Sequence, residues 1–264
     1  MKHFRFFSAL LACVTLFGLL AACAPAAPAG AGKKVVIAMD ATFPPMELVD
    51  QSKNMVGLDP DLIMAIAKDQ GFQVELKNTA WDGIFAGLEG GAYDGILSSV
   101  SITDDRKKTY DFSDPYLYSG QAIIVRTNET AIKSKADLNG KKVGAQLGTT
   151  GADEVAKIPG VTAKNYDTID LAMLDLSNSQ VDAVIVDYPV ASNYALVSPQ
   201  FKGKLQIIGD RFTNEPYGLT VQKGDPKKLL PLFNKGLKDL HANGTYDQIY
   251  AKWIGGKPPA APAQ

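Results

Sequence analysis

Hydroxyl groups and one arginine gather between residues 98 and 106 of this sequence. Serine or threonine occupies positions 98, 99, 101 and 103, directly after a short apolar run at residues 95–97, and Arg106 follows. The pattern indicates a strand-to-helix junction, where free backbone N–H groups and the positive end of a helix dipole attract anions. A planar guanidinium matches a carboxylate. We interpret the segment as a site for a small carboxylate; the alternative is a capped surface helix with a solvated arginine.

The amino-terminal residues predict export. Lys2, His3 and Arg5 precede an uncharged, mostly apolar run at residues 6–20, which is too short for an ordinary membrane span. We therefore expect residues 1–22 to be a signal peptide. The run ends in Leu-Ala-Ala-Cys23, which resembles a bacterial lipoprotein cleavage box, so we expect Cys23 to carry lipid and to anchor the protein on the extracytoplasmic or periplasmic face of the cell envelope. Ordinary cleavage without lipid is the alternative. Residues 23–33 contain no large apolar side chain and form the expected flexible tether.

Removal of the signal peptide narrows the chemistry of the mature chain. Two of the 27 basic residues and none of the 28 acidic ones leave with it, so the net charge becomes about −3, and neither nucleic acid nor an anionic membrane is an evident partner. His241 is the remaining histidine, and Cys13 is lost. A histidine- or cysteine-based catalytic triad and a His/Cys metal centre are thereby excluded. We expect no metal, no cofactor and a monomeric protein.

Short apolar segments alternate with amphipathic ones along the rest of the chain. The first kind predicts strands, and the second kind, with its helical period, predicts helices. The alternation favours an α/β fold of parallel sheets covered by helices on both sides, and the chain length favours two lobes. The expected strands span residues 34–39, 73–76, 95–97, 121–125, 142–145, 163–166, 183–186, 205–208 and 218–221. The expected helices span residues 59–69, 81–88, 151–157, 169–178, 190–197, 229–242 and 246–253.

Several short motifs follow one another in a characteristic order between residues 34 and 256. They lie at residues 40–47, 57–62, 99–106, 111–116, 146–150, 187–189 and 243–246. In order and spacing they resemble the bacterial extracellular solute-binding proteins of the polar amino-acid type (family 3), the receptors of ABC importers, and within them the members that bind basic amino acids or glutamine.

The resemblance implies a two-lobed fold of the type II periplasmic-binding-protein kind, in which two hinge strands let the lobes close on a ligand. Lobe one would comprise residues 34–118 and 214–256, and lobe two residues 119–213. Residues 257–264, rich in proline and alanine, would form a disordered tail. The implied partners are a free L-amino acid and the permease subunits of an importer.

Residue roles follow from the resemblance where the motifs match. Arg106, with the backbone of Ser101 and Thr150, would receive the α-carboxylate of the ligand. Asp187 would bind the α-ammonium, helped by the carbonyl of Ser99 and the hydroxyl of Ser101. The alternatives are that Asp187 caps the helix that follows it, and that Ser101 and Thr150 act as caps in addition to binding ligand.

Selection of the ligand side chain is expected from a second group of residues. Phe43 and Trp81 stand where the family places aromatic walls, and flat π faces suit an aliphatic stem or a guanidinium; core packing is the alternative. Asp40 would pair with a cationic side chain or accept from an amide. Glu47 would be a second acid or would form a salt bridge within lobe one. The expected ligand-binding residues are Asp40, Phe43, Trp81, Ser98, Ser99, Ser101, Arg106, Gln146, Thr149, Thr150 and Asp187, with Met46 and Glu47 left open.

The favoured function is capture of arginine or another basic amino acid, such as lysine or histidine. A glutamine receptor of the same family is the first alternative. A second is a cyclohexadienyl dehydratase, an enzyme that occurs on this fold, although no histidine and no lysine lies in the motifs of the expected cleft to donate a proton. A sensor domain is a third. We expect a binding protein and not an enzyme.

Overall fold

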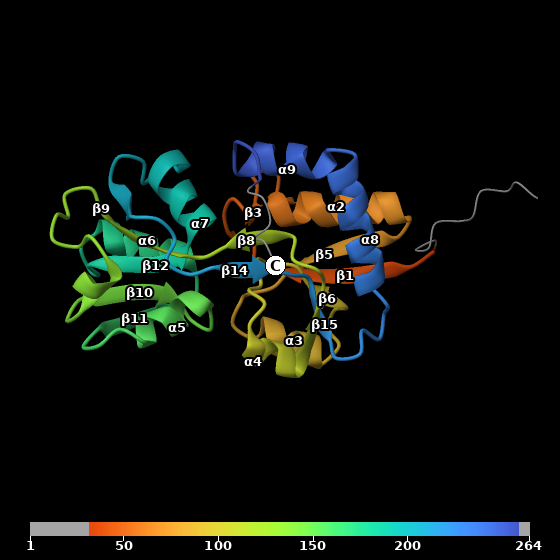
Figure 1. Cartoon of the computed structure of the whole chain (residues 1–264), viewed down its shortest axis with the longest axis horizontal. Coiled ribbons are helices and arrows are strands. Elements are labelled where there is room, and N and C mark those ends of the chain that lie inside the picture. Colours follow the sequence, from red (N-terminus) through yellow and green to blue (C-terminus); the bar gives the residue numbers. More distant parts are fainter. Residues whose placement is uncertain (1–31, 259–264) are drawn as a thin grey trace, which may run out of the picture.

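The computed structural model describes residues 32–258. Two five-stranded sheets, each flanked by helices, lie at opposite ends of the molecule (Figure 1). The signal peptide, Cys23 and most of the expected tether and tail lie outside the described residues. The first sheet has the order β5 (Gln73–Asn78), β1 (Lys34–Met39), β6 (Gly95–Ile96), β15 (Thr220–Gln222) and β7 (Tyr110–Phe112). The second has the order β11 (Thr162–Tyr166), β10 (Lys142–Gln146), β12 (Ala183–Asp187), β9 (Gln121–Arg126) and β13 (Leu205–Ile208).

Helices cover both faces of the first sheet, with α2, α8 and α9 on one face and α3 and α4 on the other (Figure 1). The bounds in this half are α2 (Leu58–Gln70), α3 (Ile84–Glu89), α4 (Asp104–Thr109), α8 (Leu230–Ala242) and α9 (Thr245–Trp253), with a small sheet of β2 (Thr42–Phe43), β3 (Glu47–Val49) and β4 (Met55–Val56). The second half contains the 3₁₀ turn η1 (Lys135–Leu138), α5 (Thr150–Ala156), α6 (Ile169–Ser177), α7 (Tyr188–Ser192) and the π turn η2 (Asn193–Val197).

Local sequence explains why these elements form. All five residues of β12 are buried, because the strand lies inside its sheet between two helix layers, and its sequence is accordingly apolar up to Asp187. Helix α8 buries Phe233, Leu237 and Leu240 on one stripe. A Cβ at Gly236 would lie 2.7 Å from Ile66 of α2, so glycine permits the close packing of these two helices.

The sheets are mixed, which corrects the expectation of parallel ones. Strand β15 runs antiparallel to β6 and β7, and β9 runs antiparallel to β12 and β13. The cause is the route of the chain. Strand β9 leads the chain from the linking ribbon into the second half, and β15 leads it from the ribbon back into the first. The other strands beside them are reached through helices within one half. Both β9 and β15 therefore run antiparallel to their neighbours. The expected helix at residues 190–197 is also divided, into α7 and the π turn η2.

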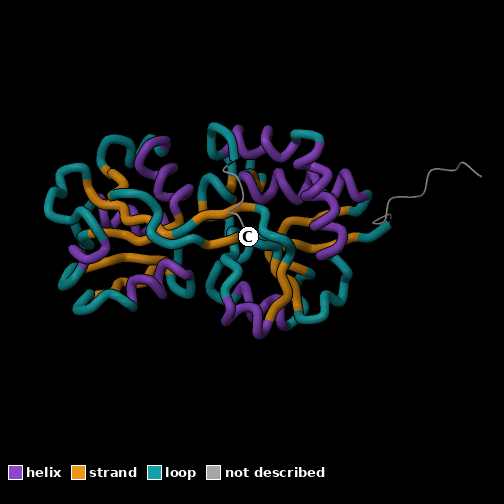
Figure 2. The backbone as a smooth tube through the Cα atoms, in the orientation of Figure 1, coloured by secondary structure: helices purple, strands orange, loops and turns teal. Residues whose placement is uncertain are grey.

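The linking ribbon consists of β8 (Leu117–Ser119) and β14 (Glu215–Tyr217), which pair antiparallel. Figure 2 shows the chain crossing here between the halves. The predicted lobe boundaries, at residues 118–119 and 213–214, fall at the end of β8 and just before β14. The largest cluster of buried apolar side chains contains residues of both halves, so the halves are packed against each other in a closed arrangement.

Gly120 allows the two crossings to approach closely. A Cβ at this position would lie 2.0 Å from the carbonyl oxygen of Thr213 on the other crossing. We expect Gly120→Ala to lower the free energy of unfolding by about 2 kcal/mol, because the backbone must move to relieve the overlap; urea denaturation measures this. Gly90→Ala is the matched control, since its Cβ would meet its nearest atom at 3.4 Å. Equal losses in the two variants would contradict the steric account.

Candidate functional site

All eleven residues expected to bind ligand line one pocket between the two halves. In this closed arrangement its volume is about 20 Å³, which is room for about one water molecule. A ligand the size of an amino acid therefore needs the lining side chains, the halves or both to move from their positions here. The lining residues are Asp40, Phe43, Glu47, Trp81, Ser98, Ser99, Ser101, Arg106, Gln146, Thr149, Thr150 and Asp187.

Arg106 extends from the short helix α4 across the boundary between the halves. Its Nη1 donates to the carbonyl of Ser101 in its own half at 3.0 Å, and its Nη2 donates to the carbonyl of Gly148 in the other half at 3.3 Å. The guanidinium lies over the rings of Trp81 and Phe85, at 5.6 and 5.1 Å. Burial lowers the pKa of Arg106, and nearby carboxylates oppose that shift. A cation held in this way, with donors left over, suits a carboxylate.

The contact with Arg106 refines the expectation for Trp81. The ring does line the pocket, at the turn before α3, but it stacks on a guanidinium of the protein itself and is 8 % exposed within a buried cluster. Its aromatic face thus positions Arg106 and also belongs to the core. Phe43, likewise 8 % exposed, packs in the main core cluster at the pocket wall.

Asp187 ends strand β12 and is almost fully buried. Its carboxylate accepts a hydrogen bond from the hydroxyl of Tyr217 on the linking strand β14. It makes no side-chain hydrogen bond that caps α7, so the capping alternative does not describe this residue. Burial, followed by the negative charge of Glu215, raises the pKa of Asp187 to about 7. Such a carboxyl loses its proton readily when a cation binds beside it.

Asp40 lies at the end of β1 and connects the two halves. Its Oδ2 accepts from the side-chain amide of Gln146 in the second half at 2.8 Å, and its Oδ1 accepts from Thr42. Its backbone N–H donates to Ser98, whose hydroxyl donates to Glu47 at 2.8 Å. Burial raises the pKa of Asp40. This network places a carboxylate from the first half and an amide from the second at the pocket wall.

Glu47 lines the pocket but forms no ion pair within the described residues. The expected alternative of a salt bridge is therefore wrong for residues 32–258. Its neighbour is a second buried acid, Asp59: burial and the charge of Asp59 raise the pKa of Glu47 well above its usual range, and burial raises the pKa of Asp59 to about 6. Met46 is fully buried in the core and does not line the pocket.

The hydroxyl residues divide into caps and pocket groups. Thr103 caps α4 and Thr149 caps α5, each accepting from a backbone N–H three residues ahead. Helix α4 thus begins at Asp104, directly after the hydroxyl-rich segment. Ser99 has a φ of 51° and its hydroxyl is buried without a partner among the described residues. Backbone strain of this kind is common at binding sites.

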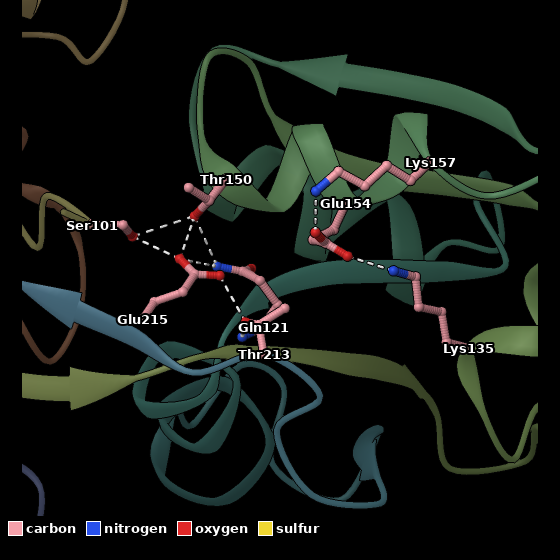
Figure 3. Close-up of polar contacts among 8 residues, drawn as sticks. All are labelled: Ser101, Gln121, Lys135, Thr150, Glu154, Lys157, Thr213 and Glu215. Carbon is pink, nitrogen blue, oxygen red and sulfur yellow. Dashed lines mark hydrogen bonds and ion pairs between the residues drawn. The ribbon is translucent and has the colours of Figure 1, made fainter. Parts of the chain in front are cut away.

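Three neighbouring polar residues were not expected. Glu215 accepts from the hydroxyls of Ser101 at 2.7 Å and Thr150 at 2.6 Å, and from the amide of Gln121 at 3.4 Å (Figure 3). Tyr217 donates to Asp187, as described above. Glu215 and Tyr217 lie in a short strand with no periodic pattern, and only the return of the chain brings them to the pocket, so local sequence carried no signal for them.

No set of three or more His, Cys, Asp or Glu side chains within residues 32–258 is arranged to hold a metal ion. Within the same range no helix has both the length and the apolar character needed to cross a membrane.

Comparison with known proteins gives consistent matches over the described range. A model of the family described as "Bacterial extracellular solute-binding proteins, family 3" matches residues 35–256. A probable histidine-binding protein of Neisseria gonorrhoeae is 36 % identical over 259 residues, covering 95 % of each chain.

Solved structures agree with the sequence matches. An ancestral arginine-binding protein, solved with arginine and also with glutamine, is 43 % identical with a TM-score of 0.79, over 84 % of this chain and 98 % of that one. ArtJ of Geobacillus stearothermophilus, a protein that binds arginine, lysine and histidine, is 40 % identical with a TM-score of 0.80, over 86 % of this chain and 97 % of that one.

Proposed function

The chain belongs to the bacterial extracellular solute-binding proteins of family 3, and from this premise we propose that it is the substrate-binding receptor of an amino-acid ABC importer. The family and the two-lobed α/β fold predicted from the sequence are confirmed. The proposed ligand is a basic amino acid, with arginine first and lysine or histidine next, held between the two lobes.

The observation that carries this proposal is the balance of charge in the pocket. Its lining contains one cation, Arg106, and three carboxyl groups, Asp40, Glu47 and Asp187. Arg106 can hold the α-carboxylate of the ligand and Asp187 its α-ammonium, as in a receptor for a zwitterion. Asp40 is hydrogen bonded to Gln146 and Thr42 and to neither member of this pair, and it supplies a negative group for a second cation. A ligand with a positively charged side chain can form an ion pair with that group, whereas glutamine offers it only the hydrogen bond of a neutral amide.

Names of relatives support the same ligand class. The relatives reported above are described as binding histidine, arginine or lysine, and one was also solved with glutamine. Glutamine is therefore the second candidate ligand, because the amide of Gln146 and the carboxylate of Asp40 can also meet a neutral amide.

A thermal-shift screen of the mature protein against the twenty amino acids tests the proposal. A ligand at 100 times its dissociation constant adds about 2.7 kcal/mol to the free energy of unfolding. We expect arginine to raise the melting temperature most, followed by lysine and histidine, with glutamine below them. A screen in which no amino acid raises the melting temperature would refute the receptor function, and a screen led by glutamine would refute the basic preference.

Binding of the zwitterion should depend on pH through Asp187, whose pKa is raised to about 7. Glu215, Tyr217, Gln121 and Arg106 are the polar groups that face it. A bound ammonium requires the ionised carboxylate, so binding releases a proton at lower pH. We expect the dissociation constant to be level above pH ~7 and to rise about tenfold per pH unit below it, as measured by calorimetry.

Asp187→Asn is the control for this titration, because an amide has no proton to lose. The variant should bind arginine more weakly, and its dissociation constant should not rise as the pH falls below about 7. A wild-type dissociation constant that is the same at about pH 5 and about pH 8 is the result that contradicts the role of Asp187.

The proposed location is the extracytoplasmic face of the cell envelope, with lipid on Cys23 as the anchor. The family is extracellular, and the Leu-Ala-Ala-Cys sequence supports the modification. We expect Cys23→Ser to move the protein from the membrane fraction to the soluble envelope fraction. A Cys23→Ser protein that stays in the membrane fraction would contradict the anchor. The proposed partners are the free amino acid and the permease subunits, and the proposed state is a monomer.

The dehydratase alternative is tested by a direct assay. Lysine and histidine are absent from the pocket lining among the described residues, but the raised pKa of Asp187, about 7, means that a carboxyl group can hold a proton there at neutral pH. A proton donor is thus present in the pocket, and a direct assay separates the two functions. We expect no aromatic product from prephenate or arogenate; turnover above the rate without protein would contradict a pure receptor.

A further inference from the structure

Glu215 lies where the chain crosses back into the first half. It is the first residue of β14 and pairs with Ser119 of β8, so it belongs to the link between the halves and not to either sheet. Figure 3 shows its carboxylate pointing between Ser101, from the first half, and Thr150, from the second. A side chain in this position contacts both halves when they close.

The hydrogen bonds of Glu215 use both of its oxygens. Oε2 accepts from the hydroxyls of Ser101 at 2.7 Å and Thr150 at 2.6 Å, and more weakly from the amide of Gln121 at 3.4 Å. Oε1 accepts from the hydroxyl of Thr213 at 2.7 Å. Hydrogen bonds to an ionised acceptor are shorter and stronger than neutral ones. Each bonded hydroxyl is therefore fixed in direction and in position.

The direction of each hydroxyl proton determines whether the hydroxyl oxygen can accept a further hydrogen bond. A serine or threonine hydroxyl has one proton, and in both Ser101 and Thr150 it is directed to Glu215. Thr150 Oγ1 then accepts from the amide of Gln121 at 3.1 Å. The oxygen of Ser101, which lines the pocket, keeps its lone pairs for an outside donor. It is thereby oriented to accept from an ammonium group.

The charge of Glu215 acts on the same end of the pocket. It is the second cause, after burial, of the raised pKa of Asp187, and it favours the charged form of Arg106. Asp187 and the hydroxyl of Ser101 are two of the three groups expected to bind the α-ammonium; the third is the carbonyl of Ser99. Glu215 therefore influences both Asp187 and Ser101, one through its charge and one through a hydrogen bond, without lining the pocket itself.

We propose that Glu215 is a positioning residue for the α-ammonium group of the ligand: it turns the Ser101 hydroxyl oxygen toward the ammonium and ties Ser101 to Thr150 across the closed lobes. This inference rests on the proposed function as an amino-acid receptor. Loss of the carboxylate should act mainly on the lifetime of the closed complex, because the contacts to Ser101 and Thr150 exist together only when the lobes are closed.

Two substitutions separate the contacts from the charge. Glu215→Gln keeps the length and removes the charge. We expect it to weaken arginine binding about tenfold, mainly through faster dissociation, and to move the pH midpoint of the affinity downward, because Asp187 loses a negative neighbour. Glu215→Asp keeps the charge but is one methylene too short to reach both hydroxyls. It should also speed dissociation, yet leave the pH midpoint close to that of the wild type.

Glu154→Gln is the matched control. Glu154 is a carboxylate in α5, the helix that begins at Thr150, but it pairs with Lys135 and Lys157 inside the second half (Figure 3). We expect it to leave both the dissociation rate and the pH midpoint of arginine binding unchanged. Stopped-flow fluorescence and calorimetry across pH provide the two readouts.

The outcomes separate the two proposals. If the wild-type protein binds no amino acid, the proposed function fails. Suppose instead that the wild type binds arginine. If Glu215→Asp, and Glu215→Gln where it folds, then have the same dissociation rate and pH midpoint as the wild type, the role of Glu215 is overturned. A Glu215→Gln protein that does not fold leaves the decision to Glu215→Asp, where a wild-type dissociation rate overturns the proposal and a faster one at an unchanged pH midpoint supports it.

Discussion

Replacing Arg106 with alanine should weaken arginine binding by more than about 100-fold, a loss of roughly 3 kcal/mol or more. The guanidinium is half-buried between Trp81, Phe85 and the carbonyls of Ser101 and Gly148. Without it, the α-carboxylate of the ligand enters a site that also contains Asp187 and has no cation to pair with. Calorimetry of the variant measures the loss, and a change of less than about tenfold would remove Arg106 from the site.

Arg106→Lys distinguishes the guanidinium geometry from its charge. Lysine keeps the positive charge but lacks the planar fork and the flat face that stacks on aromatic rings. We therefore expect Arg106→Lys to lie between the wild type and Arg106→Ala in affinity. If alanine and lysine variants bind equally well, and both melt at a lower temperature than the wild type, then Arg106 serves the packing of Trp81 and Phe85 and not the ligand.

The pocket residues that sequence could indicate share a local context. Asp187 directly follows the predicted strand at residues 183–186, and Arg106 follows the hydroxyl-rich segment after the predicted strand at residues 95–97. The edge where strands end is the usual place for a ligand in an α/β fold. The structure brings all eleven expected residues to one pocket. The resemblance of their motifs to the family predicted that they share one cleft, whereas local strand pattern predicted only the elements that carry them.

The features that sequence did not indicate depend on long-range routing of the chain. Glu215 meets Ser101 and Thr150 only because β14 returns along β8. The antiparallel entry of β9 and β15 has the same origin. Strand patterns show which segments are extended, but the direction in which a strand joins a sheet is decided by where the chain has come from.

The acidic neighbours of the pocket illustrate a second limit. Glu47 and Asp59 are separated by eleven residues and nothing in their spacing indicates a pair, yet both are fully buried and each changes the titration of the other. The contact arises because the turn between β4 and α2 passes close to β3, where a Cβ at Gly57 would lie 2.1 Å from the carbonyl oxygen of Met46. Burial of this kind is a property of the packed fold and not of the local sequence.

Replacing Asp40 with asparagine should reduce the affinity for arginine about 30-fold or more and that for glutamine by less than about threefold. The carboxylate is buried, and apart from Thr42 its partner across the lobes is the neutral amide of Gln146. A cationic side chain gains a charge-assisted hydrogen bond from it. Asparagine preserves the size and one acceptor, so a neutral amide ligand loses little.

Competition calorimetry with both ligands gives the two ratios, and Asp175→Asn is the matched control. Asp175 pairs with Lys164 and Tyr166 at the far edge of the second sheet, so the same chemical change there should leave both affinities at their wild-type values. Equal losses of arginine and glutamine binding in Asp40→Asn would show that Asp40 supports the pocket through Gln146 and Thr42 alone. A positively charged ligand side chain would then have to pair with Glu47, the other acid that lines the pocket near Ser98.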